Sequence, residues 1–374
     1  MLIVYDKFAT KDDLTNDRKI QCVLKNIVSC IRTTALNGLY ELEIKSVIDD
    51  NIINYVDRKS IIKSPSGQLY IVYWMQYDSS SKLVTIKCKH IFYYLAARMC
   101  EEKEHDNYNA SYAILSVLFE YEQDPRLIEY KFDWSTDLDS DDNLHKINYY
   151  GKNKAQALVG DANSICNLYG GELYRDNFYF SIKKKMENSR ENAFIIRDGW
   201  NTTGIRMTMD DTNTVTALWA EDNFGNIQGS SREIDGTFPY STVRYQKFSY
   251  DDDKSYLAED STNYFRTYEN PAISYDVSLV SIRNTFKDSP WLELEDYGVG
   301  DSGIVWFDLI HHEDVQRITE QKYDELAEQT ISVKLGSYRN SITNTDRYAK
   351  LLGKDDSAGR RLSALEAVIM SNKR

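Results

Sequence analysis

Alternation of apolar and polar positions is the clearest signal in the first third of the chain. Between residues 39 and 47, the apolar Tyr40, Leu42 and Ile44 alternate with charged side chains, which is the period-two pattern of a half-buried strand. Residues 68–77 and 82–89 are rich in β-branched and aromatic residues and flank a polar loop at 78–81. This arrangement predicts a hairpin with a four-residue loop.

Helical patterns follow the hairpin. Helices are predicted over residues 91–104, over 109–121 with Asn109 or Ser111 as the cap, and over 154–169, where a Gly-Gly pair ends the pattern. The next eleven residues, ELYRDNFYFSI, predict a tight hairpin with its bend at 175–177.

The second half of the chain returns to strands. They are predicted over residues 193–220, whereas the polar segment 221–263 is interpreted as a loop or insertion. After residue 300 the pattern predicts a strand, a short helix at 323–328 and a last strand, with an amphipathic helix at 361–370. Without a repeat of fixed short period, this order predicts an α+β fold, mainly β, with interleaved modules.

Length, composition and charge narrow the class of protein. A chain of 374 residues is long enough for two to four modules, and its 42% hydrophobic and 28% charged residues are typical of a soluble folded protein. The net charge of -13 argues against a general nucleic-acid binder and against binding to an anionic membrane surface. The first residues lack the features of a signal peptide, and no apolar run approaches the ~18 residues of a spanning helix. We therefore expect folding in a cytoplasm and no membrane anchor.

The five cysteines predict neither a disulfide framework nor a zinc site, because their number is odd and no two have close spacing. We expect reduced, mostly buried thiols at Cys22, Cys30, Cys88, Cys100 and Cys166. The aromatic content is high, with 28 Tyr, 13 Phe and 6 Trp, and this suits sheet surfaces and wet interfaces.

The stretch 308–314 places two histidines, His311 and His312, among three carboxylates. It is either a metal or proton-transfer site or a polar loop. A second candidate is the acidic loop with Asp137, Asp139 and Asp141, which matches the first three ligand positions of a calcium loop. The match then fails, because position six is not Gly and position twelve is Asn148. A solvated acidic turn is the favoured interpretation.

Other chemistry finds little support. The sequence has no His-Glu-x-x-His, no Gly-x-Ser-x-Gly and no phosphate-binding glycine motif. A catalytic pair of carboxylates for glycoside cleavage stays an open alternative, because the fold and not the sequence spacing determines which carboxylates lie close together. His90 lies where a strand meets a helix and is interpreted as a packed, hydrogen-bonded joint. Trp200 and Asn201 are interpreted as a turn anchor.

A series of short segments carries a family resemblance by its order along residues 36–338. The segments are Leu36-Asn37-Gly38 with Tyr40-Glu41-Leu42-Glu43, Gly67-Gln68-Leu69-Tyr70-Ile71, His90-Ile-Phe-Tyr93-Tyr-Leu95, Gly170-Gly171-Glu172-Leu173, Arg197-Asp198-Gly199-Trp200-Asn201, Thr214-Val215-Thr216-Ala217-Leu218, Gly300-Asp301, Tyr323-Asp324-x-Leu326 and Leu335-Gly336. Together they resemble the tail-associated proteins of siphophages of Gram-positive bacteria, such as lactococcal phages. This family is also called prophage endopeptidase tail or tail-associated lysin, and its N-terminal region is similar to the baseplate hub of contractile-tailed phages. The Pro-Gly that often follows the "VTxL" strand of the family is absent.

The resemblance implies interleaved β-barrel-like modules with inserted helices. A first module is expected over residues 1–95, a helical and hairpin insertion over 96–190, a second β module with a polar insertion over 191–300, and returning strands with a terminal helix over 301–374. The lytic activity of the family resides in C-terminal domains beyond this region. The resemblance therefore implies no catalytic, cofactor-binding or metal-binding residue here, and it places the histidine pair in a solvent-exposed turn.

The function implied by the resemblance is a structural baseplate hub at the tip of a phage tail. A homotrimer would form a ring or plug below a hexameric distal tail protein and open for DNA ejection. Receptor-binding proteins and the tape-measure protein are further expected partners, with phage DNA present only in transit and the virion tail tip as the location. The alternatives are a cell-wall hydrolase acting on peptidoglycan and an adsorption module that binds host polysaccharide.

Overall fold

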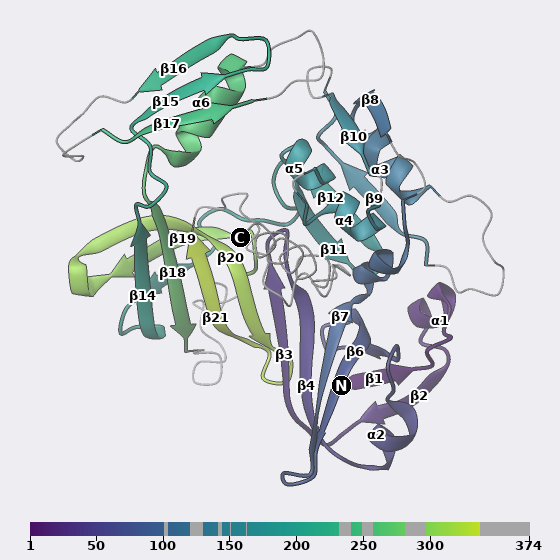
Figure 1. Cartoon of the computed structure of the whole chain (residues 1–374). Coiled ribbons are helices and arrows are strands. Elements are labelled where there is room, and N and C mark those ends of the chain that lie inside the picture. Colours follow the sequence, from purple (N-terminus) through teal and green to yellow (C-terminus); the bar gives the residue numbers. More distant parts are fainter. Residues whose placement is uncertain are drawn as a thin grey trace, which may run out of the picture.

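The computed structural model describes residues 1–100, 104–119, 130–140, 144–149, 151–161, 163–231, 241–248, 257–280 and 297–336. Within these residues strands predominate and short helices lie between them, so the structure confirms the predicted α+β, mainly β class (Figure 1). The predicted helix at 361–370 lies outside the described residues.

One sheet of 13 strands runs through the molecule, and its pairs are antiparallel except for β13 with β19. The main path has the order β14-β18-β21-β20-β3-β4-β7-β6-β5-β1-β2, and β19 joins it at β20. The strands are β1 (Leu2–Tyr5), β2 (Ile20–Leu24), β3 (Ile27–Ala35), β4 (Tyr40–Val47), β5 (Ile61–Lys63), β6 (Leu69–Asp78), β7 (Leu83–His90), β13 (Ile195–Arg197), β14 (Thr202–Asp210), β18 (Ala272–Leu279), β19 (Ser302–Phe307), β20 (His312–Asp324) and β21 (Gln329–Gly336).

The pairing of β3 with β20 makes the two ends of the chain share this sheet. Their register runs from Ala35 opposite Glu320 to Ile31 opposite Asp324. Figure 1 shows the early strands β3 and β4 beside the late strands β20 and β21. The interleaving expected from the sequence is thus achieved by one strand pair that joins distant parts of the chain.

Two short helices precede β7, and further helices and two small sheets follow it along the chain. The helices are α1 (Lys11–Thr15), α2 (Asp50–Tyr55), the 3-10 helix η1 (Ile91–Ala97), α3 (Ala110–Leu118), α4 (Lys154–Leu158) and α5 (Ile165–Leu168). The small sheets consist of β8 (Glu104–Tyr108) with β10 (His145–Asn148), and of β9 (Asp133–Thr136), β11 (Glu172–Asp176) and β12 (Tyr179–Lys183).

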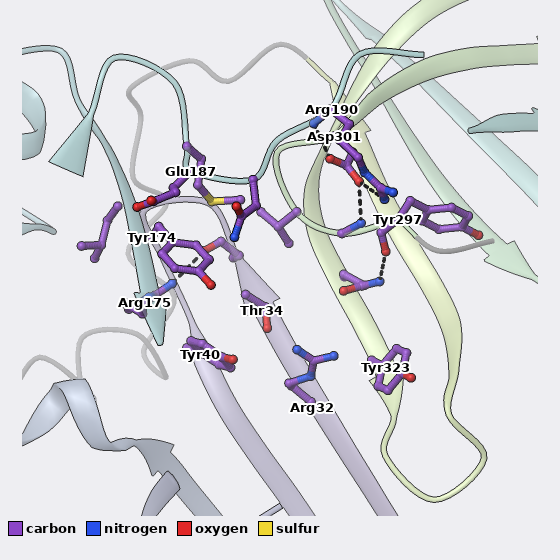
Figure 2. A pocket seen from close by; sticks show the side chains of 17 residues that line it. Arg32, Thr34, Tyr40, Tyr174, Arg175, Glu187, Arg190, Tyr297, Asp301 and Tyr323 are labelled. Atoms are coloured by element: carbon purple, nitrogen blue, oxygen red, sulfur yellow. Dashed lines mark hydrogen bonds and ion pairs between the residues drawn. The ribbon is translucent and has the colours of Figure 1, made fainter. Parts of the chain in front are cut away.

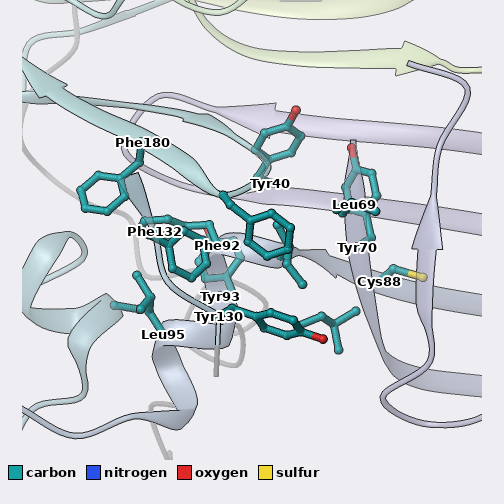
Figure 3. Close-up of a cluster of buried hydrophobic side chains, with 14 of the residues drawn as sticks. Tyr40, Leu69, Tyr70, Cys88, Phe92, Tyr93, Leu95, Tyr130, Phe132 and Phe180 are labelled. Atoms are coloured by element: carbon teal, nitrogen blue, oxygen red, sulfur yellow. The ribbon is translucent and has the colours of Figure 1, made fainter. Parts of the chain in front are cut away.

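The largest core extends from β1 to β12 and contains a group of aromatic side chains around Phe92 (Figure 3). The ring of Phe92 lies edge-on to Tyr93, Phe132 and Phe180, with centroid separations of 5.6, 6.3 and 5.5 Å. These edge-to-face contacts add to the free energy of burial and join η1 to the sheet of β12. A second core lies under β18, β20 and β21.

A third core belongs to a separate small module, which Figure 1 shows at the margin of the molecule. Strands β15 (Ala217–Glu221), β16 (Ile227–Ser231) and β17 (Val243–Lys247) form its sheet, and α6 (Leu257–Tyr268) packs against it. Of the two interpretations of residues 221–263, the loop is therefore wrong where the structure describes it, and the segment belongs to a module inserted between the paired strands β14 and β18. The segment reads as polar because only one face of this sheet is covered, so its short strands bury few residues.

Two of the predicted helices are shorter in the structure than the sequence pattern indicates. The helix predicted over 91–104 ends at Ala97, because the next residues are extended and pair with residues 152–154. The backbone N–H of Lys154 donates to the carbonyl of Arg98 over 2.8 Å. The helix predicted over 154–169 is two helices, and Gly160 with φ of 94° lies in the break. A residue in this left-handed conformation cannot continue an α-helix.

The short helix predicted at 323–328 is instead the turn between β20 and β21. Asp324 lies opposite Gln329 in the strand register, and its carboxylate accepts the N–H groups of Leu326 and Ala327. Glu328 has φ of 53°, which suits a turn and not a helix. The predicted hairpin at 68–89 is confirmed, although its loop lies one residue later, at 79–82.

Candidate functional site

A cleft of 660 Å³ lies where the N-terminal and C-terminal parts of the chain meet (Figure 2). Its walls come from β3, from β11, from the segment 186–190 and from the chain beside β19 and β20. The charged side chains on its walls are Arg32, Arg175, Glu187, Arg190 and Asp301. Because these segments are far apart in the sequence, the cleft marks the joint between the parts of the fold.

Glu325 forms the first tie across this joint. Its side chain is 1% exposed, and Oε1 lies 2.8 Å from Nε of Arg32 on β3. The carboxylate also accepts the N–H and the hydroxyl of Ser66, over 3.1 and 3.0 Å. The Arg32 guanidinium lies 4.6 Å from the ring centroid of Tyr323. A buried carboxylate with these partners holds β3 and the 64–68 turn against the β20–β21 turn.

Two further carboxylate–arginine ties join the segments on the other side of the cleft. Asp301 accepts the backbone N–H of Arg190 over 2.6 Å and its guanidinium over 2.9 Å. Glu172, at the start of β11, forms a bidentate pair with Arg317 on β20 and accepts the N–H of Met186. These ties connect β11 and the following segment to the C-terminal strands.

Arg175 and Asn37 fix β11 to the β3–β4 turn. The Arg175 guanidinium donates to the carbonyls of Gly38 and Ala35 and to the hydroxyl of Tyr93. The Asn37 side chain accepts the N–H of Leu173 over 2.7 Å and donates to the carbonyl of Gly171, as a neighbouring strand would. The turn residue Asn37 has φ of 47°, which asparagine tolerates well.

The carboxylates that line the cleft are all engaged. Asp301 is held by Arg190, and Glu187 lies 3.2 Å from Lys183 and accepts the hydroxyl of Tyr179. Within the described residues, each cleft carboxylate therefore has a cationic partner on another part of the chain or on the same segment.

The stretch 308–314 does not gather into a site. Residues Asp308–Ile310 form a 3-10 turn, His311 has φ of 50° and is exposed, and His312 begins β20. The predicted turn is thus right for His311 and wrong for the next three residues, which continue as strand because they pair with β19. The nearest partner of His312 is Asp314, 3.9 Å away.

In the described part of the acidic loop, two carboxylates accept hydrogen bonds from backbone N–H groups. Asp137 accepts the N–H of Lys184 over 2.8 Å, and Asp139 accepts the N–H and hydroxyl of Ser111 at the start of α3. Asp141 lies outside the described residues. The two carboxylates have separate backbone partners. Across the described residues, no group of three or more His, Cys, Asp or Glu side chains is placed to hold a metal ion.

His90 is the packed joint that the sequence predicts. Its Nδ1 accepts the N–H of Phe92, its Nε2 lies 3.0 Å from Oε1 of Gln68, and its ring stacks on Tyr40 at 4.2 Å. Complete burial, with Arg175 and Arg32 nearby, lowers the pKa of His90 well below its ordinary value. The imidazole is therefore neutral, and Nε2 carries the proton that it donates to Gln68.

The remaining candidates also have structural roles. Asn201 accepts the N–H of Arg197 and donates to the carbonyl of Ile195, which makes the residue a turn anchor, while the Trp200 ring is exposed. All five cysteines are free thiols, with Cys22 and Cys100 half-buried and the others buried. In the described part of the chain, no helix is long and apolar enough to cross a membrane.

Four of the tie residues lie inside segments that carry the sequence resemblance. Asn37, Glu172, Asp301 and Glu325 each fall within one of these short motifs. Sequence reasoning recognised the motifs but missed the roles of these residues, as well as their partners Arg32 and Arg317. The available signal was a polar residue within each segment, which for Glu325 was the unspecified position of its motif, and the partners could be found only from the fold.

No family model and no curated protein matches the sequence. Solved structures do match. The prophage tail protein gp18 from Listeria monocytogenes EGD-e has a TM-score of 0.61 at 15% identity, covering 95% of this chain and 99% of that chain. The 43 kDa tail protein of prophage MuSo2 from Shewanella oneidensis has a TM-score of 0.57 at 11% identity, with 89% and 97% covered. The tail protein from Neisseria meningitidis MC58 gives 0.54 at 7% identity, with 83% and 92% covered. The chain has the fold of phage tail proteins.

Proposed function

We propose that this chain is a structural baseplate hub protein of a phage tail tip, as the resemblance to the tail-associated family implies. The observation that carries the proposal is the joint around β3 and β20, where Glu172 and Glu325, in segments that carry the resemblance, pair with Arg317 and Arg32. A protein that transmits force along a tail needs its modules held in fixed relation. The similarity to a prophage tail protein over 95% of the chain supports the same role.

The proposed assembly is a homotrimer below a hexameric distal tail protein. A closed ring avoids the open-ended growth of head-to-tail contacts, and two similar β modules in each of three protomers would match a sixfold partner. The divisions near residues 95, 190 and 300 are proposed as the limits of these modules. Receptor-binding proteins and the tape-measure protein are proposed neighbours, and DNA would pass through the ring when it opens in the virion.

We further propose that this chain does not itself cleave the cell wall. The support is the engagement of the cleft carboxylates with arginine and lysine, and the positions of the two histidines, of which His311 ends a 3-10 turn and His312 begins β20. Activity on purified peptidoglycan that is abolished by one acidic or histidine substitution would contradict this.

The test of the hub is the solution mass by light scattering, for the chain alone and mixed with its distal tail partner. A trimer has a mass of about 130 kDa, three times the 43.4 kDa chain. The proposal expects this trimer alone, or a trimer joined to a hexamer of the partner. A monomer that stays monomeric and ignores the partner would overturn it.

A further inference from the structure

The small module of β15, β16, β17 and α6 leaves one face of its sheet uncovered. Leu218 and Ala220 of β15 are fully buried on the side of α6. On the opposite side the side chains of Trp219, Ile227, Val243 and Tyr245 are between 59% and 65% exposed. These four residues, two aromatic and two aliphatic, are named the aromatic face.

The strand register places the aromatic residues in one row. Trp219 lies opposite Tyr245 in the pair β15–β17 and opposite Gly229 in the pair β15–β16. Gly229 has no side chain to cover the indole, and a Cβ built on it would meet no atom within 4 Å. The Trp219 side chain therefore has a tyrosine on one side and no side chain beside it on the β16 side.

The charges on this face are matched with each other. Glu221 lies opposite Ile227 and Lys247, its carboxylate is 3.7 Å from the Lys247 ammonium, and it accepts the hydroxyl of Tyr245 over 2.5 Å. A charged partner would meet no net charge of opposite sign here. The pair instead offers acceptors and a donor beside an apolar ring, an arrangement suited to a neutral ligand with an apolar face and hydroxyl groups at its edge.

The size and the charge of the face argue against two other kinds of partner, a protein and a nucleic acid. Three strands of five residues cover about 16 Å by about 14 Å, or roughly 200 Å². A stable protein–protein interface buries about 800 Å² on each partner, so this face alone is too small for one. A single-stranded nucleic acid also stacks on aromatic rings, but it requires a positive groove for its phosphates. The lysine here is already paired.

We propose that the aromatic face binds a neutral polysaccharide, with sugar rings stacked on Trp219 and Tyr245. The C–H face of a pyranose ring packs on the indole, the position over Gly229 admits the next ring, and Glu221 and Lys247 hydrogen-bond the hydroxyl groups. This site goes beyond the hub role, because a hub can assemble without it. It gives the tail tip a weak, repeatable contact with a glycan surface.

The test is titration of the full chain with four soluble probes of equal length, followed by tryptophan fluorescence and calorimetry. The probes are a β-1,4-linked N-acetylglucosamine tetramer, an α-1,4-linked glucose tetramer, an oligouronate and oligo-dT. We expect saturable binding of at least one neutral tetramer and weaker binding of the two charged probes. Trp219→Ala and Gly229→Val should each weaken that binding at least tenfold.

Matched controls separate binding from folding. Trp200→Ala removes an indole of similar exposure on another part of the molecule and should leave the affinity unchanged. Gly229→Val adds a side chain into open space, so its thermal transition should be no lower than that of the parent chain.

The proposal is overturned if no neutral tetramer binds, if Trp219→Ala leaves binding intact, or if a charged probe binds more tightly. It is also overturned if Trp219→Ala changes the solution mass, because the face would then be a contact between copies. A failed glycan titration with an intact trimer leaves the hub role standing.

Discussion

At the scale of single residues, His90 makes the stability of the fold depend on pH. In the folded chain its pKa is lowered well below 6.5, whereas in the unfolded chain it is ordinary. Below pH 6.5 the unfolded state therefore binds a proton that the folded state does not. The free energy of unfolding should fall by about 1.4 kcal/mol for each pH unit from this residue alone.

The check compares the parent chain with His90→Gln by urea unfolding between pH 7.5 and 5. The variant should be less stable at pH 7.5, because the ring stacked on Tyr40 is lost. The difference between the two should shrink as pH falls, with a slope of one proton. Parallel curves would show that His90 takes up its proton in the folded state.

Two glycines in strands give a steric prediction. A Cβ on Gly303 would lie 2.3 Å from the carbonyl oxygen of Phe194, whereas one on Gly204 would meet nothing within 4 Å. Gly303→Ala should lower the free energy of unfolding by about 2–3 kcal/mol, because the buried backbone of residue 194 cannot move away freely. Gly204→Ala should leave it unchanged or slightly higher. Equal effects in urea unfolding would contradict the close approach of β19 to Phe194.

At the scale of elements, the ties at the joint differ from surface ion pairs on the same strands. Glu325→Gln leaves Arg32 half-buried without its carboxylate, which should cost about 2–3 kcal/mol after allowance for its partial exposure. Glu320 pairs with the more exposed Lys334 over 3.1 Å, so Glu320→Gln should cost under about 1 kcal/mol. Unfolding in urea measures both. Similar costs would mean that the joint relaxes around the loss.

Local patterns predicted strands better than they predicted helices. The strand at 39–47 and both hairpins followed from alternation and turn residues, which act over a few positions. The bend predicted at 175–177 is wrong by about two residues, because Arg175 and Asp176 pair with β12 and the loop is 177–178. The segment 91–104 has helix-forming residues, yet its end pairs with residues 152–154, and no local signal reports such a partner. Glu41 shows the same limit, since alternation places it on the solvent side and the fold buries it fully.

At the scale of the whole molecule, the small module is predicted to be removable. Asp210 at the end of β14 lies directly opposite Ala272 at the start of β18. Replacing residues 211–271 by Asn-Gly therefore closes a two-residue hairpin of the favoured type. The shortened chain should fold with its thermal transition within a few degrees of the parent.

A point variant controls for the deletion. Leu218→Asp places a charge in the core of the module and should expose its amides to hydrogen exchange while those of β3 and β20 stay protected. Loss of protection throughout the molecule would mean that the module supports the large sheet.

The class of fold could be predicted from the sequence, whereas the joint could not. The resemblance marked Glu172 and Asp301 only as parts of motifs and left Glu325 unspecified, because a charged residue in a short motif does not identify its partner. Arg317 and Glu172 are 145 residues apart and meet only after the sheet has formed. The aromatic face was missed because residues 221–263 read as a polar loop.

The pairing of β3 with β20 also bears on the time course of synthesis. About 290 residues separate the two strands, so at roughly 5–20 residues per second the ribosome needs about 15–60 s to supply the partner of β3. During that interval one edge of β3 is open to strands of other nascent chains. Arg32 lies on this edge strand, and a charge there disfavours such pairing. The arginine that later binds Glu325 thus disfavours wrong pairing while the sheet is incomplete, and the sheet is completed only after β20 has been synthesised.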